Sequence, residues 1–276
     1  IMLNQIDIQD IVTIAKEAGN AIMQIYKQDF EVEYKRDNSP LTLADKKAND
    51  IIEDGLNQLS VNLPILSEEG KEISYEDRKH WEYFWLVDPL DGTKEFVKKN
   101  GEFTVNIALI HRDTPVLGVV YAPALDICYW AKQDEGAFKD GQKLPLKTAG
   151  QRNTYKIVAS RSHMSDETQA FIDTIDTQKE KELISIGSSL KICLVAEGEA
   201  DIYPRLGPTM EWDTGAAHAV VCEAGFTLNR YNNSTFGKHL YNKNNLLNDW
   251  FVVNEEIHKK STNIVQDRLC YSVEIS

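Results

Sequence analysis

The feature that most constrains this chain is an apolar run that ends in two acidic residues. The stretch "YFWLVDPLDGT" runs from Tyr83 to Thr93, and its first five residues are all apolar. A short continuous apolar run predicts a strand that is buried on both faces of a sheet. Pro89 favours a tight turn after this strand, and the turn would fold Asp91 back beside Asp88. Two carboxylates in contact repel each other, so the pattern fits either a solvated turn or a site for a divalent cation.

Hydrophobic periodicity predicts helices and antiparallel strands in the first half of the chain. Apolar residues recur every three or four positions over residues 8–26, and a similar stripe begins near Thr42. We therefore expect two amphipathic helices, with Thr42 or Ser39 near the cap of the second. Asp45 would lie in its first turn, where a carboxylate suits the helix dipole. Three apolar segments separated by turn residues lie within residues 102–132, which is typical of antiparallel strands. The polar residues 70–80 predict a surface loop.

Strands and helices alternate in the second half of the chain. Short apolar segments alternate with expected helices at 165–175, 188–197 and 212–224. This alternation predicts a parallel or mixed sheet. We therefore expect an α+β or α/β protein with two halves, residues 1–150 and residues 151–276.

The net charge limits the partners that this chain can bind. The formal net charge is −13 at pH 7, which argues against a broad basic surface for a nucleic acid polymer. No apolar run is long enough to span a membrane. The four cysteines form no C-x-x-C pair, so we expect free thiols in a reducing compartment. The expected partner is a small molecule in the cytoplasm.

Acidic residues recur at other expected ends of elements. "SEEG" places Glu68 after a short apolar run, and "EWDTG" places Asp213 at the start of an expected helix. Gly92 and Thr93 follow Asp91 directly and offer backbone N–H groups and a hydroxyl to an anion. This recurrence favours the cation site over the solvated turn. The D-x-x-D spacing differs from the D-x-D of phosphatases with an aspartyl nucleophile, and the chain contains no Walker loop or EF-hand motif.

Several of these motifs together resemble one known family. "WLVDPLDGTKEF" resembles the signature of the lithium-sensitive, Mg²⁺-dependent phosphatases that include inositol monophosphatase, and "WDTGAAHAVVCEAG" resembles the second signature of that family. "LSEEG" and "SPLTLAD" fall in the family's order. The resemblance covers roughly residues 5–253. Within the family, the combined motifs are most similar to those of the bacterial 3′(2′),5′-bisphosphate nucleotidases.

The resemblance implies a layered αβαβα sandwich that binds two or three Mg²⁺ ions between its halves. Glu68, Asp88 and the carbonyl oxygen of Leu90 would hold one ion. Asp88, Asp91 and Asp213 would hold a second, and Glu68 would also touch a third. On this view the first half carries most metal ligands, and the second half carries one ligand and the substrate-binding residues.

The resemblance also implies a catalytic pair, Asp45 and Thr93, which would position and activate the attacking water. A carboxylate hydrogen-bonded to a hydroxyl can steer a proton in this way. The alternative for Asp45 is a charge at a helix N-terminus that only stabilises the helix. Together with Thr93 and the acidic cluster, we favour the catalytic role.

A bisphosphate nucleotide needs partners for its second phosphate. "SIGSSLK" offers Gly187 for close approach, Ser188 and Ser189 as donors at a helix start, and the charge of Lys191,. Ser188 could equally cap the helix. The resemblance adds three residues near the nucleotide, Ser160, His163 and Arg205. The remaining expected substrate contacts are shared with the metal and catalytic residues: Glu68, Leu90, Asp91, Gly92, Thr93 and Asp213.

The function implied by the resemblance is hydrolysis of the 3′-phosphate of adenosine 3′,5′-bisphosphate to AMP and phosphate, which clears a by-product of sulfur assimilation. The 5′-phosphosulfate analogue is a further candidate substrate. Inositol monophosphate and fructose 1,6-bisphosphate are alternatives on the same fold, although an inositol monophosphate has no second phosphate to hold. A non-catalytic metal or nucleotide sensor is the alternative in a different class, and it would be expected to lack some of the catalytic or metal-binding residues. Some relatives associate with the inner face of the membrane, but the charge of −13 gives no independent support for that location.

Overall fold

The structure is a computed structural model that describes residues 2–28, 39–148, 151–160 and 164–254. His163 lies outside the described residues. The chain begins with a short 3-10 helix, Leu3–Gln5. The helices that follow are α1 (Ile8–Tyr26), α2 (Pro40–Asn57), α3 (Tyr75–Arg78), α4 (Thr93–Val97), α5 (Asp166–Asp173), α6 (Leu190–Ala196) and α7 (Glu211–Glu223).

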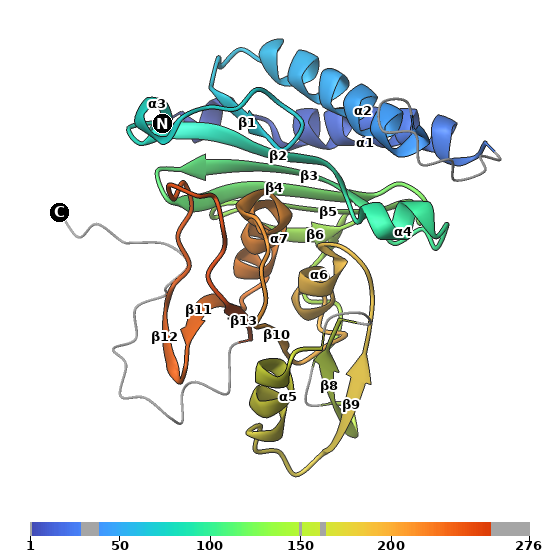
Figure 1. Cartoon of the computed structure of the whole chain (residues 1–276), viewed down its shortest axis with the longest axis vertical. Helices are drawn as coiled ribbons and strands as arrows, with labels where there is room; N and C mark the ends of the chain where they lie inside the picture. The colour runs from blue at the N-terminus through green and yellow to red at the C-terminus, as the bar shows by residue number, and fades with distance from the viewer. Residues whose placement is uncertain (1, 29–38, 149–150, 161–163, 255–276) are drawn as a thin grey trace.

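The strands form three sheets that are stacked with the helices in layers. Helices α1 and α2 cover one face of the sheet β1–β7, α6 and α7 cover the other, and the remaining strands and α5 lie beyond them (Figure 1). The strands of the first sheet are β1 (Ile65–Ser67), β2 (Tyr83–Asp91), β3 (Thr104–His111), β4 (Thr114–Ala122), β5 (Ile127–Lys132), β6 (Gly136–Lys139) and β7 (Gln142–Lys143). Those of the other two sheets are β8 (Thr154–Val158), β9 (Glu180–Ile184), β10 (Tyr203–Arg205), β11 (Leu228–Asn232), β12 (Thr235–Lys238) and β13 (Phe251–Val253).

The seven-stranded sheet keeps the order of the sequence from β1 to β7. Strand β1 is parallel to β2, and each later neighbour is antiparallel. Strand β2 is buried from Phe84 to Leu90, because α2 packs on one of its faces and α7 on the other. The predictions of a buried strand before Asp88 and of antiparallel strands within residues 102–132 are therefore confirmed.

The predicted tight turn after Asp88 is wrong. Strand β2 continues through Pro89 to Asp91, and its register against β3 shifts between Asp88 and Asp91. Asp88 lies opposite Asn106 and Asp91 opposite Thr104, so the β2 side of the pair has one extra residue. Pro89 has no N–H to donate to a ladder, and a bulge is a place in a sheet that tolerates proline. The two acids are therefore presented by a strand irregularity.

Of the two residues expected near the cap of the second helix, Thr42 and Ser39, the structure has Ser39, and the helix begins at Pro40. Its N-cap is Ser39, whose Oγ accepts a hydrogen bond from the Thr42 N–H at 3.2 Å, and Pro40 occupies the first helical position. Proline suits that position because its N–H would have no helical partner there. Asp45 therefore lies in the second turn of α2. Residues 70–80, expected to be a loop, contain the short helix α3.

The second half of the chain combines one parallel pair of strands with an antiparallel sheet. Strand β8 is parallel to β9, and the other four strands form an antiparallel sheet in the order β10-β13-β11-β12. Helices α5, α6 and α7 fall within the ranges expected from the sequence, to within about two residues at each end. The prediction of a mixed arrangement is confirmed.

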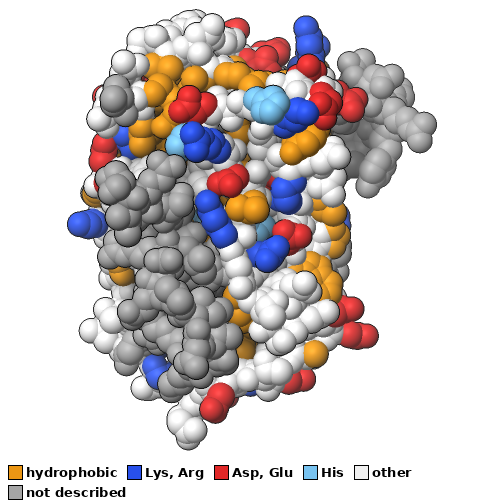
Figure 2. Space-filling view, turned by 90° about the vertical axis from the view of Figure 1, so that its left-hand side faces the viewer, with side chains coloured by type: hydrophobic (Ala, Val, Ile, Leu, Met, Phe, Trp, Pro, Cys, Tyr) orange, Lys and Arg blue, Asp and Glu red, His pale blue; other side chains and the backbone are white. Residues whose placement is uncertain are grey.

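Other expectations concern the cysteines and the surface. Cys128 and Cys193 are buried and free, whereas Cys222 is disulfide-bonded, so the expectation of free thiols is wrong for Cys222. Among the described residues, no helix combines the length and the apolar character needed to cross a bilayer. On the face shown in Figure 2, Lys and Arg side chains are interspersed with Asp and Glu.

Candidate functional site

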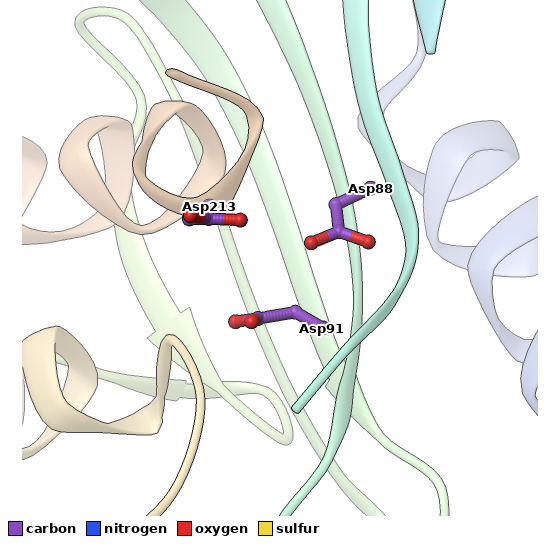
Figure 3. A group of neighbouring side chains, drawn as sticks. All are labelled: Asp88, Asp91 and Asp213. Carbon is purple, nitrogen blue, oxygen red and sulfur yellow. The ribbon is translucent and has the colours of Figure 1, made fainter. Parts of the chain in front are cut away.

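Three aspartates from two distant parts of the chain converge between β2 and α7. Asp88 and Asp91 extend from β2 toward Asp213, which reaches them from the first turn of α7 (Figure 3). One carboxylate oxygen of each residue lies within 4.8 Å of the corresponding oxygens of the other two. Asp88 is 1% exposed. The structure therefore brings together the three residues that the sequence assigned to the second metal.

The strand irregularity fixes how Asp88 and Asp91 are presented. The Leu90 N–H donates to Asp88 Oδ1 at 3.1 Å, so the backbone folds around the first carboxylate. Asp91 Oδ2 accepts the Ser189 N–H at 2.7 Å and the Asn106 Nδ2–H at 3.4 Å. The Leu90 side chain is buried in the core beneath α1 and α2, which leaves only its backbone to face the acids.

Glu68 reaches the same cluster because β1 and β2 are parallel neighbours. Ser67 pairs with Val87, and the Glu68 N–H donates to the Val87 carbonyl at 3.1 Å. Glu68 therefore follows β1 at the level where Asp88 follows Val87. Although Glu68 as a residue is exposed, its carboxyl group is close enough to that of Asp88 for each to shift the pKa of the other.

The pKa of each acid in this cluster is raised. Burial is the largest cause in every case, since it disfavours the charged carboxylate. It raises the pKa of Asp91 to about 7, with a further increase from the charge of Asp213. The pKa of Asp88 is raised well above its usual value by burial and by Asp91 and Glu68. The pKa values of Glu68 and Asp213 rise by burial, and hydrogen bonds to Asp88 and Met210 oppose the rise.

These acids fit a site for hard divalent cations. The cluster gathers carboxylate oxygens that repel one another when ionised, and Mg²⁺ or Ca²⁺ binds such oxygens preferentially. The pKa of Lys191, a basic residue close to Asp91, is lowered by its own burial, although Asp91 opposes the shift. The carboxylate oxygens of this cluster are therefore well suited to bind a metal ion.

Asp45 and Thr93 belong to helices that pack against each other. Asp45 is 8% exposed on α2, and α2 contacts α4, whose first residue is Thr93. The pKa of Asp45 is raised to about 8, first by burial and then by the charges of Glu69 and Glu68. Asp45 therefore lies close to the acids that follow β1. Gly92 precedes α4 with a φ of 91°, a conformation that glycine adopts without a steric penalty.

The acids open into a polar cavity of about 220 Å³. Asp91 and Asp213 line it on one side, and Lys191 and Arg205 bring positive charge to the same space. Arg205 donates to the Pro208 carbonyl at 3.1 Å. The cavity is also lined by three residues that the sequence analysis assigned to the substrate: Gly92, Ser160 and Ser188.

The "GSSLK" stretch also makes structural contacts that the sequence did not predict. The Gly187 N–H donates to Glu102 Oε2 at 2.8 Å, and a Cβ at Gly187 would lie 2.5 Å from Glu95 Cγ. Gly187 thus permits close packing against Glu95 and Glu102. Ser188 has a φ of 53°, and its buried hydroxyl has no hydrogen-bond partner in the described part of the chain.

A second cavity of about 500 Å³ adjoins the first. Both are lined by Ser160, Tyr203, Arg205 and Pro208, so they share a wall. The second is largely apolar, and the residues that make it so include Met164, Leu206 and Trp250. A polar chamber beside an apolar one suits a ligand with a charged end and a flat, less polar end.

Some residues of the site carried no sequence signal that was used. Lys94 and Glu95 line the polar cavity and directly follow the aspartate motif, so their position could have drawn attention to them. Ser189 was expected as a donor at a helix start, but its contacts were not: its N–H donates to Asp91 Oδ2, and its hydroxyl interacts with Thr104 and Asn106, each at 2.9 Å. The contacts of Ser189 join residues that are far apart in the sequence. Hydrophobic periodicity cannot predict such contacts.

Known proteins that are similar to this chain identify its family. The Inositol monophosphatase family matches residues 3–269 of the chain. This chain belongs to the inositol monophosphatase family. The 3′(2′),5′-bisphosphate nucleotidase CysQ of Salmonella typhimurium is 48% identical over 222 residues, covering 79% of this chain and 88% of that protein. The CysQ of Buchnera aphidicola is 44% identical over 246 residues, with 87% and 91% covered.

Solved structures of the inositol monophosphatase family share the fold. The crystal structure of CysQ from Bacteroides thetaiotaomicron has a TM-score of 0.83 and 43% identity, and covers 91% of this chain and 97% of its own. An inositol monophosphatase II from Staphylococcus aureus has a TM-score of 0.71 at 23% identity, with 95% of each chain covered, and shows the fold alone. The predicted family and its layered αβαβα sandwich are confirmed.

Proposed function

We propose that this chain hydrolyses the 3′-phosphate of adenosine 3′,5′-bisphosphate to AMP and phosphate, with Mg²⁺ as its cofactor. The observation that carries the proposal is the polar cavity, which has acids on one side and Lys191 and Arg205 in the same space. Such a cavity can hold one phosphate through cations bound to the acids and a second through basic side chains. The similarity to several CysQ nucleotidases supports this substrate.

The acids divide into two groups that would hold the ions. Glu68, Asp88 and the Leu90 carbonyl would bind one ion, with Glu68 also touching a third. Asp88, Asp91 and Asp213 would bind another, which agrees with the 4.8 Å limit on the separation of their oxygens. Bound Mg²⁺ ions supply charge neutralisation and a more acidic attacking water.

The residues of the chain orient the reactants around these ions. Asp45 would accept a hydrogen bond from the Thr93 hydroxyl, and Thr93 Oγ1 would accept one from the attacking water. As the water attacks, its proton would pass to Thr93 Oγ1 while the original Thr93 proton passes to the Asp45 carboxylate. The Gly92 backbone, at the start of α4, would face the phosphate that is cleaved.

The rest of the substrate would extend into the second half of the chain. Lys191, Arg205 and the unpartnered Ser188 hydroxyl would bind the 5′-phosphate. The base would enter the adjoining apolar cavity, past Ser160, which lines both chambers. His163 is proposed to contact the nucleotide from outside the described residues. The 5′-phosphosulfate analogue, with the same 3′-phosphate, is proposed as a second substrate, and the cytoplasm as the place of action.

Phosphate release from matched substrates tests the proposal. Adenosine 3′,5′-bisphosphate, adenosine 3′-monophosphate, inositol 1-phosphate and fructose 1,6-bisphosphate would each be assayed with Mg²⁺ and with EDTA. We expect kcat/KM to be highest for the bisphosphate nucleotide, and to fall for the 3′-monophosphate because Lys191 and Arg205 lose their partner. Equal kcat/KM for the nucleotide and the sugar phosphates would overturn the substrate assignment. Undiminished release in EDTA would overturn the metal assignment.

A further inference from the structure

The segment 239–248, which we call the strap, connects β12 to β13 and lies against the start of α7. Leu247 of the strap forms an isolated antiparallel bridge with Met210. The Glu211 N–H donates to the Leu246 carbonyl at 2.9 Å, and the Asn248 N–H donates to the Thr209 carbonyl at 2.9 Å. In Figure 1 this segment rises beside α7 toward the seven-stranded sheet. The strap thus pairs with the backbone that leads into the helix of Asp213.

Helix α7 lacks an ordinary cap of its own. Its N-cap is Met210, whose side chain has no oxygen to accept the first helical N–H groups. Asp213 Oδ2 accepts the Met210 N–H at 2.8 Å, so the acid that points to the metal site also closes the helix start. Apart from this bond, the strap supplies further hydrogen bonds to the start of the helix.

Glu211 is the first anchor of the strap. Its side chain is fully buried, with 0% exposure. The carboxylate accepts the Asn242 N–H at 2.7 Å, the Lys243 N–H at 3.0 Å and the Lys243 Nζ at 2.7 Å. A buried carboxylate with three such donors is well compensated, and it binds its partners more strongly than a neutral acceptor would.

Asn248 is the second anchor. The two hydrogens of its Nδ2 group are shared among three acceptors, the Met210 carbonyl at 2.8 Å, Thr209 Oγ1 at 3.0 Å and Thr214 Oγ1 at 3.1 Å,. Its Oδ1 accepts from His239 Nε2 at 3.0 Å. Asn248 therefore ties the residues before and after the helix start to each other and to the far end of the strap.

The strap is itself held from the opposite side by α3. Arg78 is 2% exposed, and it donates to Asn242 Oδ1 at 2.6 Å and to the Asn244 carbonyl at 2.8 Å. Asn242 Nδ2 donates back to the Arg78 carbonyl at 2.8 Å. The strap is therefore fixed between α3 and α7.

We propose that Glu211 and Asn248 are positioning residues, which hold the strap against the start of α7 and thereby set Asp213 at its distance from Asp88 and Asp91. The inference rests on the proposed function, since it takes Asp213 to be a metal ligand. Neither residue touches the ion or the substrate. A metal site depends on its ligands being held to within about 0.5 Å, and residues behind the ligands commonly affect metal affinity.

The test is the binding of Mg²⁺ alone, measured by isothermal titration calorimetry without substrate, in wild type and in Glu211→Gln. The Gln amide nitrogen would face one of the backbone N–H donors of the strap. We expect the affinity for one ion to weaken about tenfold, with kcat restored to the wild-type value at saturating Mg²⁺. Glu223→Gln is the matched control, because Glu223 accepts two backbone N–H groups, of Asp134 and Gly136, at the other end of α7.

Equal Mg²⁺ isotherms for Glu211→Gln and Glu223→Gln would overturn the positioning role. Asn248→Ala gives an independent measurement of the same effect, with circular dichroism used to confirm folding, and an unchanged isotherm there would also count against the proposal. Asp213→Asn distinguishes failure of the metal assignment from failure of the positioning role of the strap. A wild-type isotherm in Asp213→Asn overturns the metal assignment and the strap together. A weakened isotherm in Asp213→Asn with a wild-type one in both strap variants overturns the strap alone.

Discussion

Asp91 shows how one side chain can be held in place and still remain available to a ligand. Its Oδ2 is engaged by the Ser189 N–H and by Asn106, which fixes the rotamer from the α6 side. The carboxylate also lines the polar cavity. An asparagine at this position keeps an acceptor for Ser189 but loses the charge that attracts a cation.

Asp91→Asn is therefore expected to lower kcat/KM by about 10³-fold, which corresponds to about 4 kcal/mol of lost transition-state stabilisation. The measurement is phosphate release from adenosine 3′,5′-bisphosphate at saturating Mg²⁺. Asp113→Asn is the matched control, because Asp113 is paired with Lys238 and Thr114 away from the cluster. Full activity in Asp91→Asn would contradict the metal assignment.

The raised pKa values of the clustered acids predict how the free energy of unfolding depends on pH. The folded-state pKa values of Asp45 and Asp91 are raised to about 8 and about 7, above those of an unfolded chain. Between the unfolded and folded pKa values, the folded protein therefore binds more protons, so its free energy of unfolding falls as pH rises. In EDTA, titration of these two groups gives an expected decrease of about 3 kcal/mol from pH 6.5 to pH 9.

Urea unfolding at several pH values would measure this slope in wild type and in Asp91→Asn, which removes one of the two groups. The variant should show a smaller decrease with pH. A free energy of unfolding that rises across this range in EDTA would show that the acids are not protonated in the folded, metal-free protein.

Single residues differ in how well the sequence could predict their place. Asp88, Asp91 and Asp213 were brought together as expected, because acids at element ends in a family motif carry a strong signal. Asn106 carried none, and the contacts of Ser189 with Asp91 and Asn106 could not be predicted, since they depend on how α6 meets β3. The tight turn at Pro89 was a reasonable local interpretation, but pairing with β3 overrode it.

At the scale of elements, the position of α7 on the sheet decides whether Asp213 can reach β2. Gly118 of β4 lies directly beneath the helix, where an added Cβ would be 2.1 Å from the Ala216 carbonyl oxygen. Only a glycine allows the two backbones to approach this closely. A residue larger than glycine at position 118 would therefore increase the distance between α7 and the sheet.

Gly118→Ala is expected to push α7 away from β4, lowering the free energy of unfolding by about 3 kcal/mol and weakening Mg²⁺ binding. Urea unfolding and Mg²⁺ calorimetry would report the two effects. Gly141→Ala is a suitable control, because its φ of 84° imposes strain while nothing lies within 4 Å of an added Cβ. It should lose about 1–2 kcal/mol and keep its Mg²⁺ affinity. Equal Mg²⁺ affinity in both variants would show that the distance between α7 and β4 does not determine Mg²⁺ binding.

Most elements were predictable because their apolar patterns are long and regular. Helix α1 matches the predicted range 8–26, and β3 to β5 match the three apolar segments. Short elements were harder to predict from the sequence. Helix α3 has only one buried residue, Arg78, and its burial comes from the strap rather than from an apolar face.

At the scale of the whole molecule, the candidate site joins layers that are otherwise separate. Asp88 and Asp91 belong to the seven-stranded sheet, and Asp213 belongs to the helix layer beneath it. The stacking order followed from the family motifs. The local pattern alone gave no relation between residues 88 and 213, since that relation depends on tertiary packing.

Mg²⁺ should therefore stabilise the whole fold. A ligand that binds only the folded state at about 100 times its Kd adds about 2.7 kcal/mol. We expect Tm to rise with Mg²⁺ in wild type, and to rise much less in Asp213→Asn. Differential scanning calorimetry would measure this, with NaCl at equal ionic strength as the control. The same rise in NaCl would indicate screening of the negative charge rather than binding.

The strap has a further consequence for the order in which the protein acquires its structure. Strands β3 to β7 are joined to their neighbours by short connections, so they can pair as soon as each is made. Arg78, by contrast, bonds to Asn242, 164 residues later in the chain. On a ribosome, the start of α7 cannot be held until the strap has emerged. Cation binding is therefore expected to be one of the last events of biosynthesis, after the sheet beneath it has formed.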